Sequence, residues 1–325
     1  TEKVKDYLNE SVPYEIGIEP GSINYIKQSK IYFIRTKALD NDNFLIYPIS
    51  NSIIPINPKF YKSVGLEKHD VLLSKDSSIG EVSVVGGKNY EKHCFSSGIV
   101  KLNIIKDKYY LIGLLKHPFF KQQLYSKVPK GSVISHAKDI WLDCEIPIVN
   151  NKTKEEISNL VKDILSIEEK IINKNEQINF LFDDELNKNK KRKNKNITVS
   201  YLNSKSWYTR LDAGFLEKKV QNFLDQVLNY NDGFYFINEE EGFNVKRGQN
   251  LQESNIGYSI YSNVPINKGY KLIFPKNLSE HRTVKDNHYL ANKNDLQVLK
   301  TGDVIFGAEG FEKGRATIFL DKIEK

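Results

Sequence analysis

Residues 154–186 of the chain read KEEISNLVKDILSIEEKIINKNEQINFLFDDEL, and this stretch decides the architecture. Its apolar side chains recur at alternating spacings of three and four residues, interrupted at Lys174. They are Ile157, Leu160, Ile164, Ile167, Ile171, Ile178 and Leu181. A heptad seam of this kind, free of Gly and Pro, predicts a long helix that packs against another helix in a coiled coil. About 33 residues at ~1.5 Å each would span roughly 50 Å. The alternative is that the narrow stripe packs on a globular body.

Strand-rich sequence lies on both sides of this helix. Ile, Val, Tyr and Phe alternate there with Gly, Pro and Asn turn signals. In the first part we expect a helix over 109–126 with a kink at 116–118, and short strands at 30–35, 71–74, 81–85 and 99–103. In the last part we expect a helix over 210–228 and a final strand at 316–320. The predicted fold class is α/β (mixed α+β), with two similar strand-rich domains separated by a long coiled-coil-type helix.

The expected organisation has four parts. They are a first domain at 1–150, the coiled-coil helix at 151–190, a polar basic linker at 191–206, and a second domain at 207–325. The chain ends soon after a strand, without a closing helix, so we expect the second domain to be incomplete at its C-terminus.

The two flanking domains share an internal repeat. FIRTKAL at 33–39 parallels LIFPKNL at 272–278, HDVLLS at 69–74 parallels GDVIFG at 302–307, and IGEV at 79–82 parallels KGRA at 313–316. Order and approximate separation are both kept. The pattern predicts two diverged copies of one domain, which would present two different surfaces on one scaffold.

The amino-acid composition of the chain limits the classes of function that it can have. The chain of 325 residues carries a formal charge of +7, and its isoelectric point is about 9.0. A basic balance fits a polyanionic partner, although an AT-rich genome would also supply many lysines. Only Cys94 and Cys144 occur, so we expect a reducing, cytoplasmic environment and no disulfide framework. No apolar run is long enough to span a bilayer.

Several segments together resemble a known family. DVLLSKDSSIG at 70–80 and GDVIFGAEG at 302–310 resemble one segment in two copies, and SSGIV at 96–100 resembles the strand that follows it. FFKQQL at 119–124, then Gly131-Ser132, Ile140 and IPI at 146–148, resemble the end of a recognition domain. RLDA at 210–213 resembles the start of another. In this order the segments resemble the specificity (S) subunits of type I restriction–modification systems. His69 departs from the family pattern, where a Gly usually precedes the Asp, and the family's second conserved helix is absent up to Lys325.

The resemblance implies a function without chemistry. Such a subunit binds double-stranded DNA, reads a bipartite target, and joins adenine methyltransferase subunits with motor–nuclease subunits. The target base would be flipped into the methyltransferase pocket. Each domain would place loops in the major groove, lysines and arginines would hold phosphates, and the helix would set the distance between half-sites. No cofactor is implied for this chain.

Residue type and turn position select the candidate DNA contacts. In the first domain they are Arg35, Lys37, Ser74, Lys75 and Lys88. In the second domain they are Lys276, His281, Arg282, Lys285, Glu309, Lys313 and Arg315. Arg and Lys suit guanine, Ser serves a base or a phosphate, and Glu accepts from cytosine. For each of them the alternative is a solvated surface side chain or, for Glu309, a turn cap. We expect His136 to lie on the surface, and Trp141 and Trp207 to be packing residues.

The sequence shows no catalytic constellation. It has neither a glycine-rich cofactor loop with an Asn/Asp-Pro-Pro-aromatic motif nor a Walker loop, and its histidines are not paired at metal-ligand spacing. Glu168-Glu169-Lys170 has nuclease-like letters but lies on the predicted helix. Two alternatives remain: the target-recognition region of a single-chain restriction enzyme whose catalytic part precedes Thr1, and a coiled-coil adaptor that binds only protein.

Overall fold

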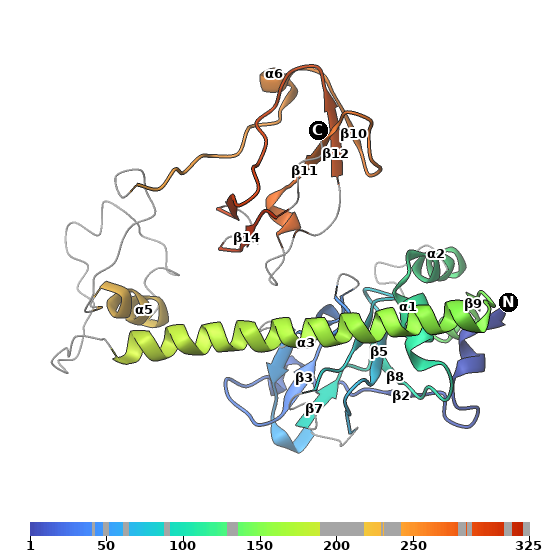
Figure 1. The fold of residues 1–325 in the computed structure, drawn as a ribbon. Helices are drawn as coiled ribbons and strands as arrows, with labels where there is room; N and C mark the ends of the chain where they lie inside the picture. Colours follow the sequence, from blue (N-terminus) through green and yellow to red (C-terminus); the bar gives the residue numbers. More distant parts are fainter. Residues whose placement is uncertain are drawn as a thin grey trace. The chain divides into compact units, whose positions relative to one another are not determined.

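The computed structural model describes residues 1–40, 43–47, 52–60, 65–87, 92–128, 136–188, 218–228, 230, 242–278, 284, 288–308 and 314–320 (Figure 1). The chain forms two compact units, Thr1–Phe180 and Leu181–Lys325. Both combine short strands with helices, which agrees with the mixed α/β class expected from the sequence.

The first unit is built on two small sheets. One has the strand order β2-β8-β5-β6, and all of its neighbouring strands pair antiparallel. Its strands, in that order, are Tyr14–Ile16, Ile99–Leu102, Val71–Ser74 and Val82–Val84. The other has the order β4-β3-β7, with strands Ile53–Pro55, Tyr32–Ile34 and His93–Phe95; β3 runs antiparallel to β4 and parallel to β7. A further pair joins β1 (Glu2–Lys3) to β9 (Glu145–Ile146). The four strands predicted in this unit are confirmed to within two residues at each end.

Strand β5 shows why these segments become strands at the centre of the unit. All four of its residues are buried, and alternate side chains enter different apolar clusters. Val71 and Leu73 face a cluster with Tyr110 and Trp141, whereas Leu72 packs with Phe95 beside the second sheet. Because side chains alternate across a strand, an apolar run of this length can serve two cores at once. Burial of each Val or Leu side chain contributes about 1.5–3 kcal/mol.

Two helices cover the first of these clusters. Helix α1 runs from Lys108 to Lys116 and α2 from Pro118 to Lys127, so the kink predicted at 116–118 is a complete break. Pro118 lacks a backbone N–H and disfavours helical geometry in the residue before it, which is why His117 adopts an extended ψ of 139°. The His117 side chain then caps α2 by accepting a hydrogen bond from the Phe119 N–H. Four-residue turns η1 (Val4–Tyr7) and η6 (Ile140–Asp143) close the same core.

The predicted long helix is present as α3, which spans Asn151–Lys188. The Asn150 side chain accepts the Thr153 N–H at 2.9 Å and so caps the first turn. At ~1.5 Å per residue, the helix is roughly 57 Å long. Its N-terminal half packs along the first unit (Figure 1).

The second unit has a smaller described core. A sheet of order β10-β12-β11 contains Ser259–Ser262, His288–Asn292 and Tyr270–Leu272, all paired antiparallel. Ile256, Leu272 and Leu290 form its buried centre. A separate antiparallel pair joins β13 (Val304–Phe306) to β14 (Ala316–Ile318). The second unit also contains helices α5 (Lys218–Leu228) and α6 (Glu253–Ile256) and the turn η7 (Pro275–Asn277). Of the helix predicted over 210–228, residues 210–217 lie outside the described part of the chain.

Hydrogen bonds in the two units match at the repeated segments. The Ser74 N–H bonds to the Glu81 carbonyl at 2.9 Å, and the Gly307 N–H bonds to the Arg315 carbonyl at 2.8 Å. In the return direction, Gly80 donates to Ser74 at 2.8 Å and Gly314 donates to Gly307 at 2.8 Å. Gly80 and Gly314 both have positive φ, 78° and 88°. A left-handed turn of this kind favours glycine, which explains why the sequence keeps it in both copies.

The match extends to the turn that begins each segment. The Asp70 side chain accepts the Glu67 N–H at 2.8 Å, and the Asp303 side chain accepts the Lys300 N–H at 2.8 Å. The preceding residue has positive φ in both turns, 69° at His69 and 96° at Gly302. His69 therefore occupies a position where glycine is favoured, and its Nδ1 lies 2.9 Å from the Tyr109 hydroxyl. The hydrogen bonds at these turns therefore match between the two units.

Candidate nucleic-acid interface

Three chain segments meet at one edge of the first unit. They are the turn η3 (Thr36–Ala38), which follows β3, the residues Lys75 and Asp76 after β5, and Gly98 before β8. The Gly98 carbonyl accepts hydrogen bonds from the backbone N–H groups of Lys75 and Asp76 at 2.9 and 3.3 Å. The two turns predicted to contact DNA in this domain are therefore neighbours in the tertiary structure.

Gly98 is needed for this close approach. A Cβ atom at this position would lie 3.0 Å from the Thr36 methyl carbon and 3.3 Å from the Asp76 Cβ. Both distances are tighter than ordinary van der Waals contact. A side chain here would push the turn after β3 away from the turn after β5, and so separate Arg35 and Lys37 from Lys75.

Charged side chains at this edge are arranged around Asp76. Its two carboxylate oxygens lie 2.7 Å from Lys75 Nζ and 2.7 Å from His136 Nδ1. Burial by itself would raise the pKa of Asp76, but the hydrogen bonds from Lys75 and His136 outweigh burial and hold the pKa below its usual value. Asp76 is therefore a carboxylate that neutralises Lys75 and orients His136. We call Lys75, Asp76 and His136 the Asp76 cluster.

The predicted DNA contacts of the first unit fall into different environments. Lys37 is exposed and Arg35 is half-buried at the start of η3. Lys75 is 19% exposed and paired with Asp76. Ser74 is fully buried, and its hydroxyl donates to the Asp76 carbonyl at 2.9 Å, so we do not carry it into the proposed contact set. Lys88 lies outside the described residues.

Fewer of the predicted contacts can be placed in the second unit. Lys276 is exposed on the turn η7 (Pro275–Asn277), and its ammonium lies 5.6 Å from the centre of the Phe274 ring. Arg315 is half-buried and donates to the Leu278 carbonyl at 2.9 Å, which ties β14 to η7. The others lie outside the described residues: His281, Arg282, Lys285, Glu309 and Lys313.

Helix α3 has two apolar faces. Its buried face consists of Val161 and Leu165, flanked by the half-buried Ile157 and Ile172, and packs on the α1 side of the first core. Gly113 of α1 permits this packing, because a Cβ there would lie 3.0 Å from an Ile157 methyl carbon. At 100° per residue, the predicted heptad seam lies roughly 90° around the helix from this buried face.

Most of the predicted seam faces solvent in the chain as described. The exposed members are Leu160, Ile167, Ile171 and Leu181, and the half-buried members are Ile157, Ile164 and Ile178. Leu160 is 62% exposed and Ile167 54%. The alternative was that this stripe packs on the globular body. Among the described seam residues, Ile157 alone packs against the buried core of the first unit. Coiled-coil pairing of the seam stays a prediction.

A carboxylate fixes α3 to the first unit. Glu168 accepts the backbone N–H groups of Phe44 at 3.0 Å and Leu45 at 2.7 Å. Burial raises the pKa of Glu168 more strongly than these bonds lower it. Next to it, the Lys116 ammonium donates to the carbonyls of Asp40, Asn43 and Val82. The nuclease-like Glu168-Glu169 pair thus has a structural role, since Glu169 pairs with Lys68.

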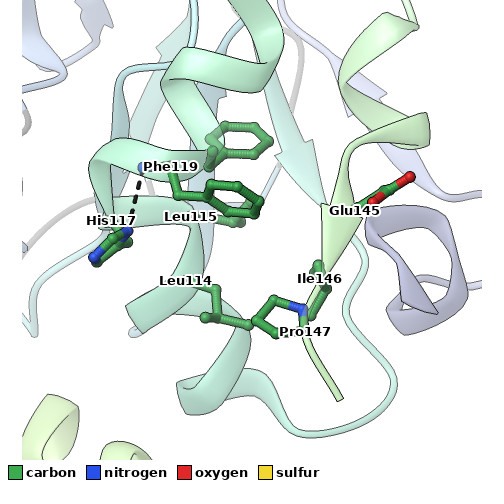
Figure 2. Close-up of a pocket in the computed structure, with 8 residues that line it drawn as sticks. Leu114, Leu115, His117, Phe119, Glu145, Ile146 and Pro147 are labelled. Atoms are coloured by element: carbon green, nitrogen blue, oxygen red, sulfur yellow. Dashed lines mark hydrogen bonds between the residues drawn. The ribbon is translucent and has the colours of Figure 1, made fainter. Parts of the chain in front are cut away.

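The apolar cavity in Figure 2 lies between α1, α2 and β9 and has a volume of about 320 Å³. Eight residues line it: Leu114, Leu115, His117, Phe119, Phe120, Glu145, Ile146 and Pro147. The Glu145 carboxylate points away from the apolar side chains in Figure 2. This lining offers hydrocarbon contacts without converging polar groups. A more polar cavity of about 230 Å³ in the second unit is lined by Tyr261, Ser262, Asn263, Phe274, His288 and Tyr289.

No group of three or more His, Cys, Asp or Glu side chains in that part of the chain could hold a metal ion. None of the helices that can be described there is both long and apolar enough to cross a membrane.

Solved structures that are similar to this chain include type I restriction–modification S subunits. An S subunit from M. genitalium is 14% identical, with a TM-score of 0.40, over 57% of this chain and 44% of the other. The HsdS subunit from Thermoanaerobacter tengcongensis is 13% identical, with a TM-score of 0.35, over 61% and 51%. A structure reported for complex assembly and conformational transition of the type I R-M system is 15% identical, with a TM-score of 0.33, over 54% and 41%. The chain thus spans about half, or less, of the length of each. No protein-family model and no curated protein sequence matches it.

Sequence reasoning missed three residues of these sites. Asp76 lies inside the quoted segment at 70–80, so its acidic side chain after an apolar strand was a usable signal. His136 is 60 residues away and pairs with Asp76 only through the fold. The role of Glu168 depends on the loop at Phe44 and Leu45, which lies more than 120 residues earlier in the sequence.

Proposed function

We propose that this chain is the DNA-reading specificity subunit of a type I restriction–modification complex and supplies recognition without chemistry. One observation carries the proposal. The hydrogen bonds at Asp70, Ser74 and Gly80 recur at Asp303, Gly307 and Gly314, while the sequences between these positions differ. A conserved scaffold with diverged loops suits a protein that reads two different half-sites of one DNA target.

Charge and position support DNA as the partner. The chain carries a net charge of +7, and Lys37 and Lys276 are exposed on corresponding turns, η3 and η7. Exposed lysines at such turns would hold phosphates and fix the register on the duplex. Base discrimination would come from the loops beside them, because major-groove edges distinguish all four base pairs.

The exposed seam supports a protein partner. Leu160, Ile167 and Ile171 form an apolar stripe on a helix whose adjacent face is already packed on the domain. Such a stripe is covered in a stable complex, here by helices of the adenine methyltransferase or of the same chain. Motor–nuclease subunits would join the resulting complex for cleavage. The roughly 57 Å helix corresponds to about 17 base pairs at ~3.4 Å each, which leaves room for a gap between half-sites.

Selection from random DNA tests the proposal. The full chain, alone and with its neighbouring methyltransferase, is incubated with duplexes that carry a randomised central stretch, and the retained DNA is sequenced. We expect two short blocks separated by a constant gap. Retention without sequence preference that falls steeply with salt would mean a nonspecific basic protein. No retention in either condition would leave the protein adaptor as the function.

Two substitutions on α3 separate partner binding from folding. Ile167→Glu changes the exposed seam, so we expect it to abolish methyltransferase association and leave the melting temperature of the chain unchanged. Leu165→Ala changes the buried face, where Leu165 is 1% exposed, and should cost about 2–5 kcal/mol of stability. Equal methyltransferase binding by the wild type and Ile167→Glu would remove the seam from the proposed interface.

A further inference from the structure

His136 lies in an environment that a solvated surface histidine does not have. The backbone of Asp76 pairs with that of His136 in an antiparallel bridge, and the Ala137 N–H bonds to the Lys75 carbonyl at 2.7 Å. Ala137 is fully buried, whereas the His136 side chain is 55% exposed. Alternation along this short extended segment therefore anchors one residue inside and projects the next one outward.

Asp76 fixes which ring nitrogen of His136 faces outward. The Asp76 carboxylate lies 2.7 Å from Nδ1, so Nδ1 carries a proton and donates a hydrogen bond to the carboxylate. Nε2 is left at the exposed edge of the ring. It accepts a hydrogen bond when the ring is neutral and donates one when the ring is charged. A side chain oriented in this way loses less conformational freedom on binding than a free surface histidine.

Lys75 makes this arrangement compatible with a polyanion. An unpaired carboxylate at this edge would repel phosphates, but Lys75 Nζ lies 2.7 Å from the second Asp76 oxygen and cancels its charge. With a neutral imidazole the Asp76 cluster is electrically neutral, and with a charged one it is +1. It lies next to Thr36, at the edge that also contains Arg35 and Lys37.

We propose that His136 is a DNA-contacting residue of the first unit and that Asp76 is its positioning residue. Nε2 of His136 hydrogen-bonds to the DNA, at a base edge or at a phosphate. The inference rests on the proposed function and adds to it a contact that turn position did not select. Lys75 acts through Asp76 and is not itself the base-reading group.

The first test uses the duplex that the wild-type chain retains from the random pool, in complex with its methyltransferase. His136→Ala should weaken binding of that duplex about tenfold, as expected for loss of a good DNA contact. Repeating the selection distinguishes the two sources of the hydrogen bond. A base contact relaxes the preference at one position of one block and leaves the salt dependence unchanged, whereas a phosphate contact weakens all sequences equally and lowers the salt slope.

The second test separates positioning from charge. Asp76→Asn removes a negative charge, so a purely electrostatic role predicts tighter binding to every duplex. Positioning predicts weaker binding instead: of the selected duplex above all if His136 contacts a base, and of every duplex if it contacts a phosphate. It also predicts no further loss when Asp76→Asn is added to His136→Ala. Lys152→Ala, an exposed lysine on the first turn of α3, is the matched surface control and should keep the selected motif.

The outcomes distinguish a failure of the role of His136 from a failure of the proposed function. If the wild-type complex retains no duplex, the proposed function fails and the inference fails with it. If the wild type selects a motif and folded His136→Ala selects the same motif with equal affinity and equal salt dependence, only the role of His136 is overturned. Circular dichroism and the melting temperature establish that each variant is folded.

Discussion

Glu168 provides the sharpest test of how α3 is held on the first unit. Its carboxylate accepts two backbone hydrogen bonds, from Phe44 at 3.0 Å and Leu45 at 2.7 Å, and its surroundings are desolvated enough to raise its pKa. Glu168→Ala leaves both N–H groups without that acceptor. A buried donor left unsatisfied costs about 1–3 kcal/mol, so we expect a loss of roughly 2–6 kcal/mol. Glu168→Gln retains one carbonyl acceptor and should cost about half as much.

The neighbouring Glu169 is the control. Its ion pair with Lys68, 2.8 Å long, is partly exposed: the lysine side chain is 51% exposed and the glutamate side chain 27%. Glu169→Ala should therefore cost about 0–1 kcal/mol. Urea denaturation of the three variants gives the midpoints, and hydrogen exchange at the Phe44 and Leu45 amides reports the local loss. If Glu168→Ala is no more destabilising than Glu169→Ala and those amides stay protected, the anchoring role is refuted.

Three further predictions concern the first unit. Gly17→Ala should destabilise it by about 3 kcal/mol or more, because the new Cβ would lie 2.1 Å from the Phe95 carbonyl oxygen; Gly65→Ala, which meets nothing within 4 Å, should have little effect on the melting temperature. Cys94 and Cys144 are buried, and burial raises the pKa of Cys94 to about 11, so a thiol reagent at pH 8 should label neither until the chain is unfolded in urea; rapid labelling of the native chain would contradict this. The lowered pKa of Asp76 means that its stabilising contribution is present above the ordinary pKa of 3.8 and is lost as the pH falls through the lower folded value. The stability that the wild type has over Asp76→Asn should therefore be present above pH 3.8 and shrink as the pH falls below 3.8; a difference that grows below pH 3.8 would contradict this.

Local sequence patterns were sufficient to predict the helices and strands that have a strong hydrophobic pattern. Strand β5 has the bounds expected from its apolar run, and α3 extends over the predicted stretch because no Gly or Pro interrupts it. The short strands β2, β4 and β7 were not expected. Each has only three residues, too few to show alternation, and each is held by pairing with a distant segment.

The two faces of α3 show where periodicity alone misleads. The regular spacing of Leu160, Ile164 and Ile167 drew attention to the seam, but Val161 and Leu165 are the residues that the first unit buries. The helix has apolar side chains on both faces. A sequence pattern cannot say which face meets the domain, because that depends on the surface that α1 offers and on the Glu168 contact.

The sequence by itself determined the mixed α/β class, the long helix and the repeated Asp-led turns, because each of these is encoded within a few consecutive residues. Only the tertiary structure decided which of the marked side chains can meet a ligand. It buried Ser74, paired Lys75, and brought His136 to Asp76 from 60 residues away. Contacts of this kind depend on loop paths and sheet order. Their free energy comes from groups that are distant in sequence, so no local spacing of residues predicts them.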